Sequence, residues 1–459
     1  MEINFSNPQH IYFIGIGGIS MSGLADLLLS EGFRVSGSDA KESSLTKDLA
    51  AKGATIYYGQ EVSHITDDVD LVVYTAAIRE DNAEFICMKE KNIPSVTRAE
   101  FLGLVMKNYK TPIAVSGTHG KTTTTSMISE IMLAADTDPT LNIGGVLQSI
   151  GSNTRNGSDD FFVFEACEYT NSFLSFFPKI SVILNVEEDH LDFFKDIDDI
   201  RNSFNRFAKL LPEDGFLVVN GEIEALEKVI DDIACPYVTY GPDDRFDYYP
   251  SDISFDAFGC PSYTCHFKNK GITHKFKLGV TGMHNVYNSL AAVAVADYLG
   301  LDMDTVEKAL LNCSGSKRRF EKKGSFNGVT VVDDYAHHPT EIEATLKTAK
   351  NVEYNTLWCV FQPHTYTRTK AFLQDFAKAL SIADRVVLAE VYPAREKDIY
   401  GCNSQNLYEE LISLGAKCDY LHSFEDIKVF LHKNCINGDL LITMGAGDIV
   451  KIADELVSE

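Results

Sequence analysis

The sequence predicts an α/β protein of three domains, in which the first and third domains are Rossmann-like. Short apolar runs alternate with helix-length amphipathic segments along all 459 residues, a pattern typical of parallel sheets flanked by helices. A chain of this length suffices for about three domains. Polar joints at residues 107–112 and 314–319 divide it, so we place the domains at residues 1–108, 109–316 and 317–459.

The first domain begins with a strand at residues 11–14, followed by a glycine turn and a helix. The turn, Gly15-Ile16-Gly17-Gly18, falls short of G-x-G-x-x-G because Ser20 replaces the last glycine, yet it offers a helix N-terminus to a phosphate. Asp39 follows the second strand, where an acid binds the ribose in dinucleotide enzymes, so NAD and other nucleotides both stay open as ligands. The remaining elements predicted here are strands at 33–36 and 70–74 and a helix over 98–107.

The central domain carries the strongest motif, Ser116-Gly117-Thr118-His119-Gly120-Lys121-Thr122-Thr123, between a strand at 113–116 and an amphipathic helix. This context predicts a P-loop ATPase-type α/β domain: backbone N–H groups converge on phosphates, Lys121 reaches the β- and γ-phosphates, and Thr122 ligates Mg²⁺. The strict P-loop pattern expects glycine where this chain has Val115. Further elements predicted are strands near 161–165, 180–184 and 215–219, a β-rich passage over 236–278 and a buried helix over 289–296.

Acidic and imidazole side chains follow two strands of the same domain. Glu165 and Glu168 come at the end of the strand near 161–165, and His190 comes shortly after the strand near 180–184. Mg²⁺ prefers oxygen ligands and keeps several waters, so one carboxylate with Thr122 and phosphate oxygens makes a sufficient shell. These residues are therefore the candidate metal ligands.

The third domain again alternates strands and helices. Polar loops follow its strands at residues 333–339, 361–368, 392–396 and 444–448. Because the ligand site of a doubly wound sheet lies outside the carboxyl ends of its strands, these loops predict one shared cleft. The predicted elements of this domain are 329–333, 339–350, 357–361, 369–383, 385–389, 404–413, 439–443 and 447–457.

The composition excludes several classes of protein. Lys+Arg 41 against Asp+Glu 66 gives a net charge of −25, which argues against wrapping a nucleic acid or docking on an anionic membrane. The 10 cysteines are scattered without a C-x-x-C pair, so we expect structural thiols. No basic and apolar leader opens the chain and no run of about 18 apolar residues occurs, so we expect a cytosolic protein.

Several of these motifs, taken in order, resemble the Mur ligase family of cytoplasmic enzymes that build peptidoglycan. The resemblance spans the whole chain. It rests on the opening glycine turn, the phosphate loop and three further motifs: Gly282-Met283-His284-Asn285, Asp333-Asp334-Tyr335-Ala336-His337-His338-Pro339 and Gln362-Pro363-His364. It implies ATP-dependent joining of L-alanine to the lactyl carboxylate of UDP-N-acetylmuramate through an acyl phosphate, with Mg²⁺ as cofactor, small-molecule partners only, and a monomer or homodimer.

The resemblance also implies roles for individual residues. The first domain would bind the UDP part of the substrate, the second ATP, and the third would close over both and admit the amino acid. The implied ATP-binding residues are Gly117, Thr118, His119, Gly120, Lys121, Thr122, Thr123, His284, Asn285, Asn288, Arg319 and Asp334. The implied UDP-substrate residues are Gly15, Gly17, Gly18, Ser38, Asp39, Thr75, Ala76, His337 and His364. The metal ligands would be Thr122, Glu165 and His190, and the catalytic residues Lys121, His190, His338 and Arg368.

The sequence departs from the family pattern at three positions. Cys167 stands in a segment that is often richer in acids, and Thr365 stands where the family often has an arginine, which makes Arg368 the cation of that loop. Asn205 replaces the lysine that is carbamylated in some relatives, so no carbamylated lysine is expected.

Three other functions stay open. A recycling ligase that adds a tripeptide to the same nucleotide sugar would share the phosphate loop and the double histidine. A nicotinamide-dependent oxidoreductase is suggested by the first glycine turn and Asp39 alone. A non-catalytic nucleotide sensor would bind ATP without forming an amide.

Overall fold

The computed structural model describes residues 3–75, 78–191, 193–313, 315, 317–394, 396–398 and 401–458. The chain forms two units, which are described separately. The first unit consists of Met1–Glu187, Ile197–Thr239 and Ala294–Leu301, and the second consists of Glu188–Asp196, Tyr240–Val293 and Asp302–Glu459. Most strand pairs in both units are parallel, which confirms the predicted α/β class.

The N-terminal sheet of the first unit has five parallel strands in the order β3-β2-β1-β4-β5. Its strands are β1 (His10–Ile14), β2 (Arg34–Asp39), β3 (Thr55–Tyr58), β4 (Leu71–Tyr74) and β5 (Ser95–Thr97). The connecting helices are α1 (Ile19–Ser30), α2 (Ser44–Ala51), η1 (Val62–His64), α3 (Ala83–Glu90) and α4 (Arg98–Met106). Ile14 pairs with Ser38 and with Tyr74, so three strands end at the same edge of the sheet.

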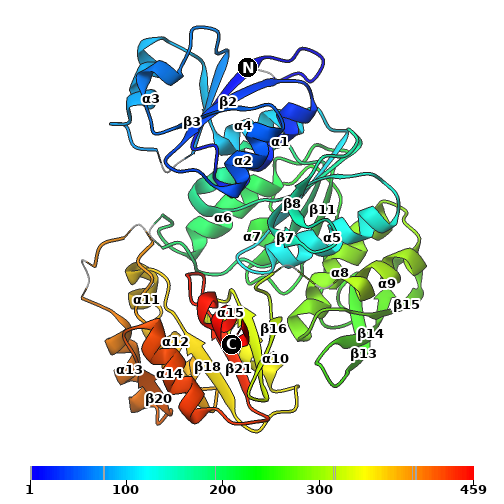
Figure 1. The fold of residues 1–459 in the computed structure, drawn as a ribbon. Helices are drawn as coiled ribbons and strands as arrows, with labels where there is room; N and C mark the ends of the chain where they lie inside the picture. Colours follow the sequence, from blue (N-terminus) through cyan, green and yellow to red (C-terminus); the bar gives the residue numbers. More distant parts are fainter. Residues whose placement is uncertain are drawn as a thin grey trace. The chain divides into compact units, whose positions relative to one another are not determined.

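Both faces of this sheet are buried. Tyr12 and Val72 point to one face, where they pack with Phe85 of α3. Phe13 points to the other face, and its ring meets Phe101 of α4 edge-on at 5.8 Å. Figure 1 shows α3 on one side of the sheet and α1 and α4 on the other. This double burial explains why strands of almost purely apolar residues were recognisable in the sequence.

The central sheet of the first unit has the strand order β12-β11-β10-β6-β9-β7-β8. Its strands are β6 (Thr111–Ser116), β7 (Thr140–Leu147), β8 (Ser152–Arg155), β9 (Phe161–Glu165), β10 (Ile180–Ile183), β11 (Phe216–Asn220) and β12 (Tyr237–Tyr240). The accompanying helices are α5 (Lys121–Ala134), η2 (Tyr169–Ser175), α6 (Ile197–Ala208) and α7 (Leu226–Val229). Ser116 pairs with Ile183, and Val115 pairs with Glu165, so the carboxyl ends of β6, β9 and β10 meet beside the phosphate loop.

The N-terminal and central sheets of the first unit pack closely through two glycines. A Cβ atom at Gly23 of α1 would collide with Thr154 of β8. A Cβ atom at Gly103 of α4 would collide with the backbone carbonyl of Ser175 in η2. The lack of a side chain at both positions lets these helices lie directly against the central sheet's elements.

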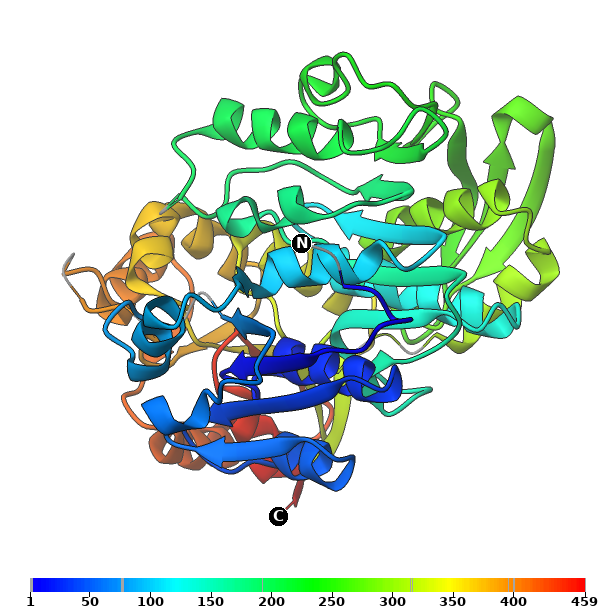
Figure 2. The same ribbon diagram turned by 90° about the horizontal axis from the view of Figure 1, so that it is seen from above.

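The second unit contains an antiparallel ribbon and two helices. These elements are β13 (Tyr248–Phe255), β14 (Pro261–Phe267), η3 (Lys268–Lys270), β15 (Ile272–Lys277), α8 (Met283–Tyr298) and α9 (Met303–Asn312). The residues of α8 from Ala294 onward belong to the first unit. The Tyr263 and Ser289 hydroxyls are 2.7 Å apart in the core and join β14 to α8. Helix α9 lies along β15 in both views (Figures 1 and 2).

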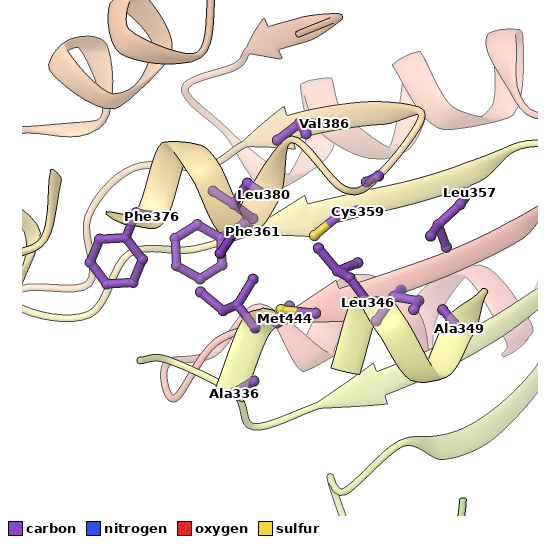
Figure 3. Packing of buried hydrophobic residues seen from close by; sticks show 14 of the residues in the cluster. Ala336, Leu346, Ala349, Leu357, Cys359, Phe361, Phe376, Leu380, Val386 and Met444 are labelled. Atoms are coloured by element: carbon purple, nitrogen blue, oxygen red, sulfur yellow. The ribbon is translucent and has the colours of Figure 1, made fainter. Parts of the chain in front are cut away.

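The C-terminal sheet of the second unit has the strand order β16-β17-β21-β18-β19-β20, in which only the β16–β17 pair is antiparallel. Its strands are β16 (Glu321–Phe326), β17 (Val329–Asp334), β18 (Leu357–Phe361), β19 (Arg385–Leu388), β20 (Cys418–Tyr420) and β21 (Leu440–Met444). The helices are α10 (Pro339–Ala349), α11 (Tyr366–Ala371), α12 (Leu373–Leu380), α13 (Ser404–Ser413), α14 (Phe424–Asn434) and α15 (Val450–Ser458). Figure 3 shows Leu346 of α10 and Phe376 of α12 packed toward Cys359 and Phe361 of β18.

One predicted helix is wrong. The segment 369–383 is not one helix but parts of two, because α11 ends and α12 begins at Phe372, whose backbone leaves the helical region (φ −114°, ψ 25°). The ring centroids of Phe372 and His338 are 4.8 Å apart, so the residue at the break contacts the loop before α10. Among the described residues, no helix has the length and apolar character needed to cross a bilayer.

Candidate functional site

The glycine turn between β1 and α1 is held by the end of β2. The backbone N–H groups of Gly15 and Ile16 both donate to the Ser38 carbonyl at 2.9 Å, and Gly17 N–H donates to Asp39 Oδ2 at 2.8 Å. A Cβ atom at Gly17 would lie 2.7 Å from the same Asp39 oxygen, which explains the glycine there. Because these N–H groups are already bonded, an anion at this turn would bind to the first-turn N–H groups of α1.

The other predicted residues of this edge lie beside the turn. The Ser38 hydroxyl is buried and donates to Glu84 Oε2 at 2.5 Å, so its carbonyl rather than its hydroxyl faces the turn. A Cβ atom at Gly15 would lie 3.1 Å from Thr75 Cγ2, which places Thr75 next to the turn. Ala76 lies outside the described residues.

The phosphate loop connects β6 to α5 and is braced from β10. Gly117 (φ +145°) and Gly120 (φ +82°) adopt backbone conformations that side chains disfavour, and a Cβ atom at Gly117 would lie 2.9 Å from Leu184 Cβ. The Asn185 side chain accepts from His119 N–H at 2.7 Å and donates to the His119 carbonyl at 3.1 Å. Asn185 therefore fixes the loop, and sequence reasoning gave it no role although it is a polar residue at a strand end.

Lys121 is enclosed by the loop that it belongs to. Its Nζ donates to the carbonyls of Gly117 (2.5 Å) and Thr118 (3.1 Å) and to the Glu168 carboxylate (3.0 and 3.3 Å). Its side chain is 13% exposed and that of Glu168 is 3% exposed. Burial alone would lower the pKa of Lys121, but the charges of Glu168, Cys167 and Glu165 raise it above its usual value. Lys121 is therefore a permanent cation at the start of α5.

Thr122 and Glu165 form an oxygen pair at the start of the same helix. The Thr122 hydroxyl donates to Glu165 Oε2 at 2.8 Å, and Gly144 N–H donates to the same oxygen at 3.0 Å. A hydroxyl and a carboxylate are the oxygen donors that Mg²⁺ prefers, so the residues fit the predicted ion. Thr123, which follows them, is buried in the first turn of α5.

Two predicted imidazoles lie in different units. In the first unit, His119 Nε2 is 3.6 Å from Glu187 Oε2. In the second unit, His190 has a positive φ of 53°, and its N–H donates to Asp189 Oδ1 at 2.7 Å. The first unit thus brings together the predicted phosphate-loop residues with Thr122 and Glu165, while His190 belongs to the segment Glu188–Asp196 of the second unit.

Arg368 is paired with an acid that sequence reasoning did not select. Its Nε and Nη2 donate to Asp189 Oδ1 at 3.3 and 3.0 Å, and its Nη1 is 3.3 Å from His364 Nδ1. Burial alone would raise the pKa of Asp189, but the charges of Arg368, His190 and His338 lower it below its usual range. Both partners are largely buried, at 11% and 7% exposure, so this is an ion pair removed from most solvent.

Two predicted histidines, His337 and His364, lie after the carboxyl ends of β17 and β18. The rings of His337 and His364 lie 5.9 Å apart, and His364 stacks on Tyr392 at 5.6 Å. Burial, with the positive charges of His337 and Arg368, lowers the pKa of His364 to about 4. His337 Nδ1 lies 3.2 Å from Glu341. The structure therefore presents a His364 imidazole with a lowered pKa beside the Arg368 guanidinium.

His338 and Asp334 shape the loop between β17 and α10. His338 caps α10 by accepting from Thr340 N–H at 3.4 Å, and its Nε2 is 3.2 Å from the Glu188 carbonyl. Asp334 accepts backbone N–H groups of Phe320 and Ala336 at 2.8 Å each. Burial raises the pKa of Asp334 to about 6, although the charge of Arg319 opposes this shift. The Asp334 carboxylate therefore joins the backbone at Phe320 to the backbone at Ala336.

The predicted adenine-side residues begin helix α8. Asn285 and Asn288 are buried and joined by a hydrogen bond of 2.8 Å, and the Asn285 amide also donates to the Thr281 carbonyl. His284 is exposed beside them. Arg319 lies in the same unit, with Nη1 3.8 Å from Glu341 Oε1. The two asparagines therefore fix each other, while His284 and Arg319 remain closer to solvent.

Comparison with known proteins supplies the family. Three Mur ligase models match the chain: the "Mur ligase family, catalytic domain" over residues 10–110, the "Mur ligase middle domain" over 115–296 and the "Mur ligase, glutamate ligase domain" over 318–447. A UDP-N-acetylmuramate–L-alanine ligase of Lachnospira eligens is 56% identical over 457 residues, covering 99% of each chain.

Solved structures agree with these matches. A crystal structure of a UDP-N-acetylmuramate–alanine ligase from Thermotoga maritima is 31% identical, covers 98% of each chain and superposes with a TM-score of 0.81. A murein peptide ligase from Psychrobacter arcticus is 26% identical over 98% of each chain, with a TM-score of 0.73. Full-length identity well above that needed for common ancestry, together with three family models in order, shows that the chain belongs to the Mur ligase family.

Proposed function

We propose that the chain is an ATP-dependent ligase that joins L-alanine to the lactyl carboxylate of UDP-N-acetylmuramate and releases ADP and phosphate. The Mur ligase family is ATP-dependent. The observation that carries the proposal is the full-length identity of 56% to a UDP-N-acetylmuramate–L-alanine ligase. The enclosed Lys121 and the Thr122–Glu165 oxygen pair on one phosphate loop support the ATP-dependent step. The product would be a precursor of peptidoglycan.

The chemistry explains why a phosphate loop is needed. A carboxylate and an amine do not condense at neutral pH until the carboxylate oxygen becomes a good leaving group. In our proposal the lactyl carboxylate attacks the γ-phosphate of ATP, giving ADP and an acyl phosphate, and the neutral amine of L-alanine then displaces phosphate. Phosphoryl transfer of this kind depends on positioning and charge neutralisation, which the N–H groups at the start of α5 and Lys121 would supply.

Thr122, Glu165 and His190 are our candidates to hold Mg²⁺. The ion, when bound, would offset the charge that builds up on the transferring phosphoryl group. The Thr122 hydroxyl and Glu165 Oε2 are 2.8 Å apart, so both oxygens could bind one ion. Glu165 would then lose its hydrogen bond from Thr122 and bind the ion instead. The chain has Asn205 in place of a carbamylated lysine, and its amide is bonded to the carbonyls of Val229 and Asp231.

The residues of the second unit would receive the muramoyl and alanine groups. In our proposal, His337 and His364 contact the muramoyl end of the nucleotide sugar. His338 and Arg368 orient the amino acid. Arg368 would act from a fixed position, because Asp189 holds two of its donors. With its pKa lowered to about 4, His364 would meet the substrate as a neutral hydrogen-bonding group rather than as a base. His284, Asn285 and Asn288 would lie near the adenine of ATP, and Arg319 and Asp334 would lie toward its phosphates or ribose.

The remaining parts of the proposal concern the whole chain. We assign residues 1–108 to the UDP substrate, 109–316 to ATP and 317–459 to the amino acid and to closure. The partners would be small molecules, with no nucleic acid or membrane, and the protein would act in the cytoplasm as a monomer or homodimer. The net charge of −25 supports the exclusion of nucleic acid.

One experiment tests the activity. The chain is incubated with UDP-N-acetylmuramate, ATP and Mg²⁺ together with each amino acid in turn, and the product is weighed by mass spectrometry. We expect a product heavier by one alanine residue and stoichiometric ADP. A parallel incubation with murein tripeptide tests the recycling activity of the kind named for the Psychrobacter relative. Product from tripeptide but none from L-alanine would overturn the proposal.

A further inference from the structure

A buried glutamate of helix α3 forms hydrogen bonds with strands β1 and β2 of the N-terminal sheet. Glu84, on the first turn of α3, has no exposed surface. Its Oε1 accepts from the Tyr12 hydroxyl of β1 at 2.9 Å and lies 2.9 Å from His64 Nδ1 of η1. Its Oε2 accepts from the Ser38 hydroxyl at the end of β2 at 2.5 Å. One carboxylate therefore joins three elements in addition to its own helix.

This arrangement is costly if it serves packing alone. Moving a carboxylate out of water carries a large desolvation penalty, and a well-packed apolar side chain at such a position is often equally or more stabilising. What a carboxylate adds is direction, because its two oxygens accept donors at fixed angles. Tyr12 and His64 hold one oxygen of Glu84, so the carboxylate cannot turn away from Ser38.

Ser38 carries this constraint to the glycine turn. Its hydroxyl is tied to Glu84, and its carbonyl accepts the N–H groups of Gly15 and Ile16, both at 2.9 Å. Two N–H groups converging on one carbonyl fix the direction in which the turn enters α1. In our proposal, the first-turn N–H groups of α1 bind the diphosphate of the nucleotide sugar. Because the glycine turn is bonded to the Ser38 carbonyl, the direction of these N–H groups depends on the position of Ser38.

We propose that Glu84 is a positioning residue for the nucleotide-sugar site: through the Ser38 hydroxyl and carbonyl it sets the glycine turn that receives the diphosphate. This inference rests on the proposed function for its ligand. Glu84 does not touch the substrate in this proposal, and its effect is confined to the N-terminal sheet. It should therefore alter the binding of the nucleotide sugar without altering that of ATP.

The test uses Glu84→Gln in the full chain, because the amide keeps the shape of the side chain but has only one acceptor oxygen for Tyr12, His64 and Ser38, where the carboxylate has two. Binding of UDP-N-acetylmuramate and, separately, of a non-hydrolysable ATP analogue is measured by titration calorimetry. We expect the Kd of the nucleotide sugar to rise by about tenfold and that of the ATP analogue to stay within about twofold. In turnover, KM for the nucleotide sugar should rise with kcat nearly unchanged.

Two matched variants separate positioning from stability. Tyr12→Phe removes one donor to Glu84 but leaves the Ser38 bond, so it should lower the melting temperature while the Kd of the nucleotide sugar stays within about twofold. Glu100→Gln changes an exposed capping glutamate of α4 in the same part of the chain and controls for the loss of charge. Both controls should leave nucleotide-sugar binding unchanged if the effect runs through Ser38.

Ser38→Ala keeps the inference testable if Glu84→Gln does not fold. This variant removes the hydroxyl and keeps the carbonyl, and we expect it to weaken nucleotide-sugar binding like Glu84→Gln, with no further loss in the double variant. A Kd within about twofold of wild type in a folded Glu84→Gln, or in Ser38→Ala, would overturn the inference. Wild-type chain that does not bind UDP-N-acetylmuramate would instead refute the proposed function, so the two failures are told apart.

Discussion

Replacing Lys121 by methionine should cost stability as well as activity. Methionine has about the length of lysine but cannot pair with Glu168, whose carboxylate is 3.0 Å from Nζ and whose side chain is 3% exposed. Breaking a buried pair by removing one partner typically costs about 3–5 kcal/mol, because the other charge stays buried. The attraction itself is roughly 5 kcal/mol at 3 Å with an effective dielectric constant of about 20.

Solvent reaches part of the Lys121 side chain, so we expect a loss near the lower end, about 3 kcal/mol in the free energy of unfolding. Adding Glu168→Gln to the lysine variant removes the uncompensated charge and should restore about 2 kcal/mol of this loss. Activity should not follow stability, because phosphate binding needs the cation itself. ADP release should be abolished in Lys121→Met and remain abolished in the double variant.

The assay is a double-mutant cycle. Denaturant unfolding is measured for the wild type, Lys121→Met, Glu168→Gln and the double variant, and ADP release is measured with all three substrates present. A Lys121→Met chain that unfolds at the wild-type denaturant concentration would refute the energetic reasoning. A double variant no more stable than Lys121→Met would show that Glu168 is not the cause. ADP release near the wild-type rate in either lysine variant would refute the phosphate-loop role.

Three further predictions concern the metal, a histidine and an ion pair. Glu165→Gln should raise the Mg²⁺ concentration for half-maximal ADP release by about tenfold, and an unchanged titration would remove Glu165 from the metal site. The pKa of His364 is lowered from 6.5 to about 4, so the wild type should lose stability as the pH falls from about 6.5 to about 4. The melting temperature of His364→Asn should fall less over this pH range, and an equal fall would contradict the pKa shift. Asp189→Asn should free Arg368 and raise KM for L-alanine by about fivefold with KM for ATP unchanged; equal rises in both would point to general damage.

Some elements could be predicted because their signals are local. The run from β6 through the phosphate loop into α5 combines a buried strand with an apolar centre, two glycines with positive φ and a largely buried helix, all within consecutive residues. The apolar helix predicted over 289–296 is likewise the buried part of α8. Such segments keep the same structure whatever they contact, so periodicity and glycine position suffice.

Other features depend on contacts that no local pattern encodes. The edge strands β16 and β20 are largely polar, and their pairing with β17 and β19 makes them strands. At the helix break, the Phe372 ring contacts His338, a residue far away in the sequence, and no local pattern encodes this contact. At the site, Asp189 and Arg368 are separated by 179 residues, so their ion pair is invisible in the sequence. The chemistry of each residue could be inferred, but not its partner.

Gly23 and Gly103 have a consequence for dissecting the chain. Both glycines press helices of the N-terminal sheet against elements of the central sheet, leaving no room for a methyl group. A fragment that ends at residue 108 would expose this contact surface, so we expect it to aggregate, whereas a fragment that also keeps the central sheet would not. An alanine at either glycine would act as a wedge between the two sheets and could create a temperature-sensitive protein.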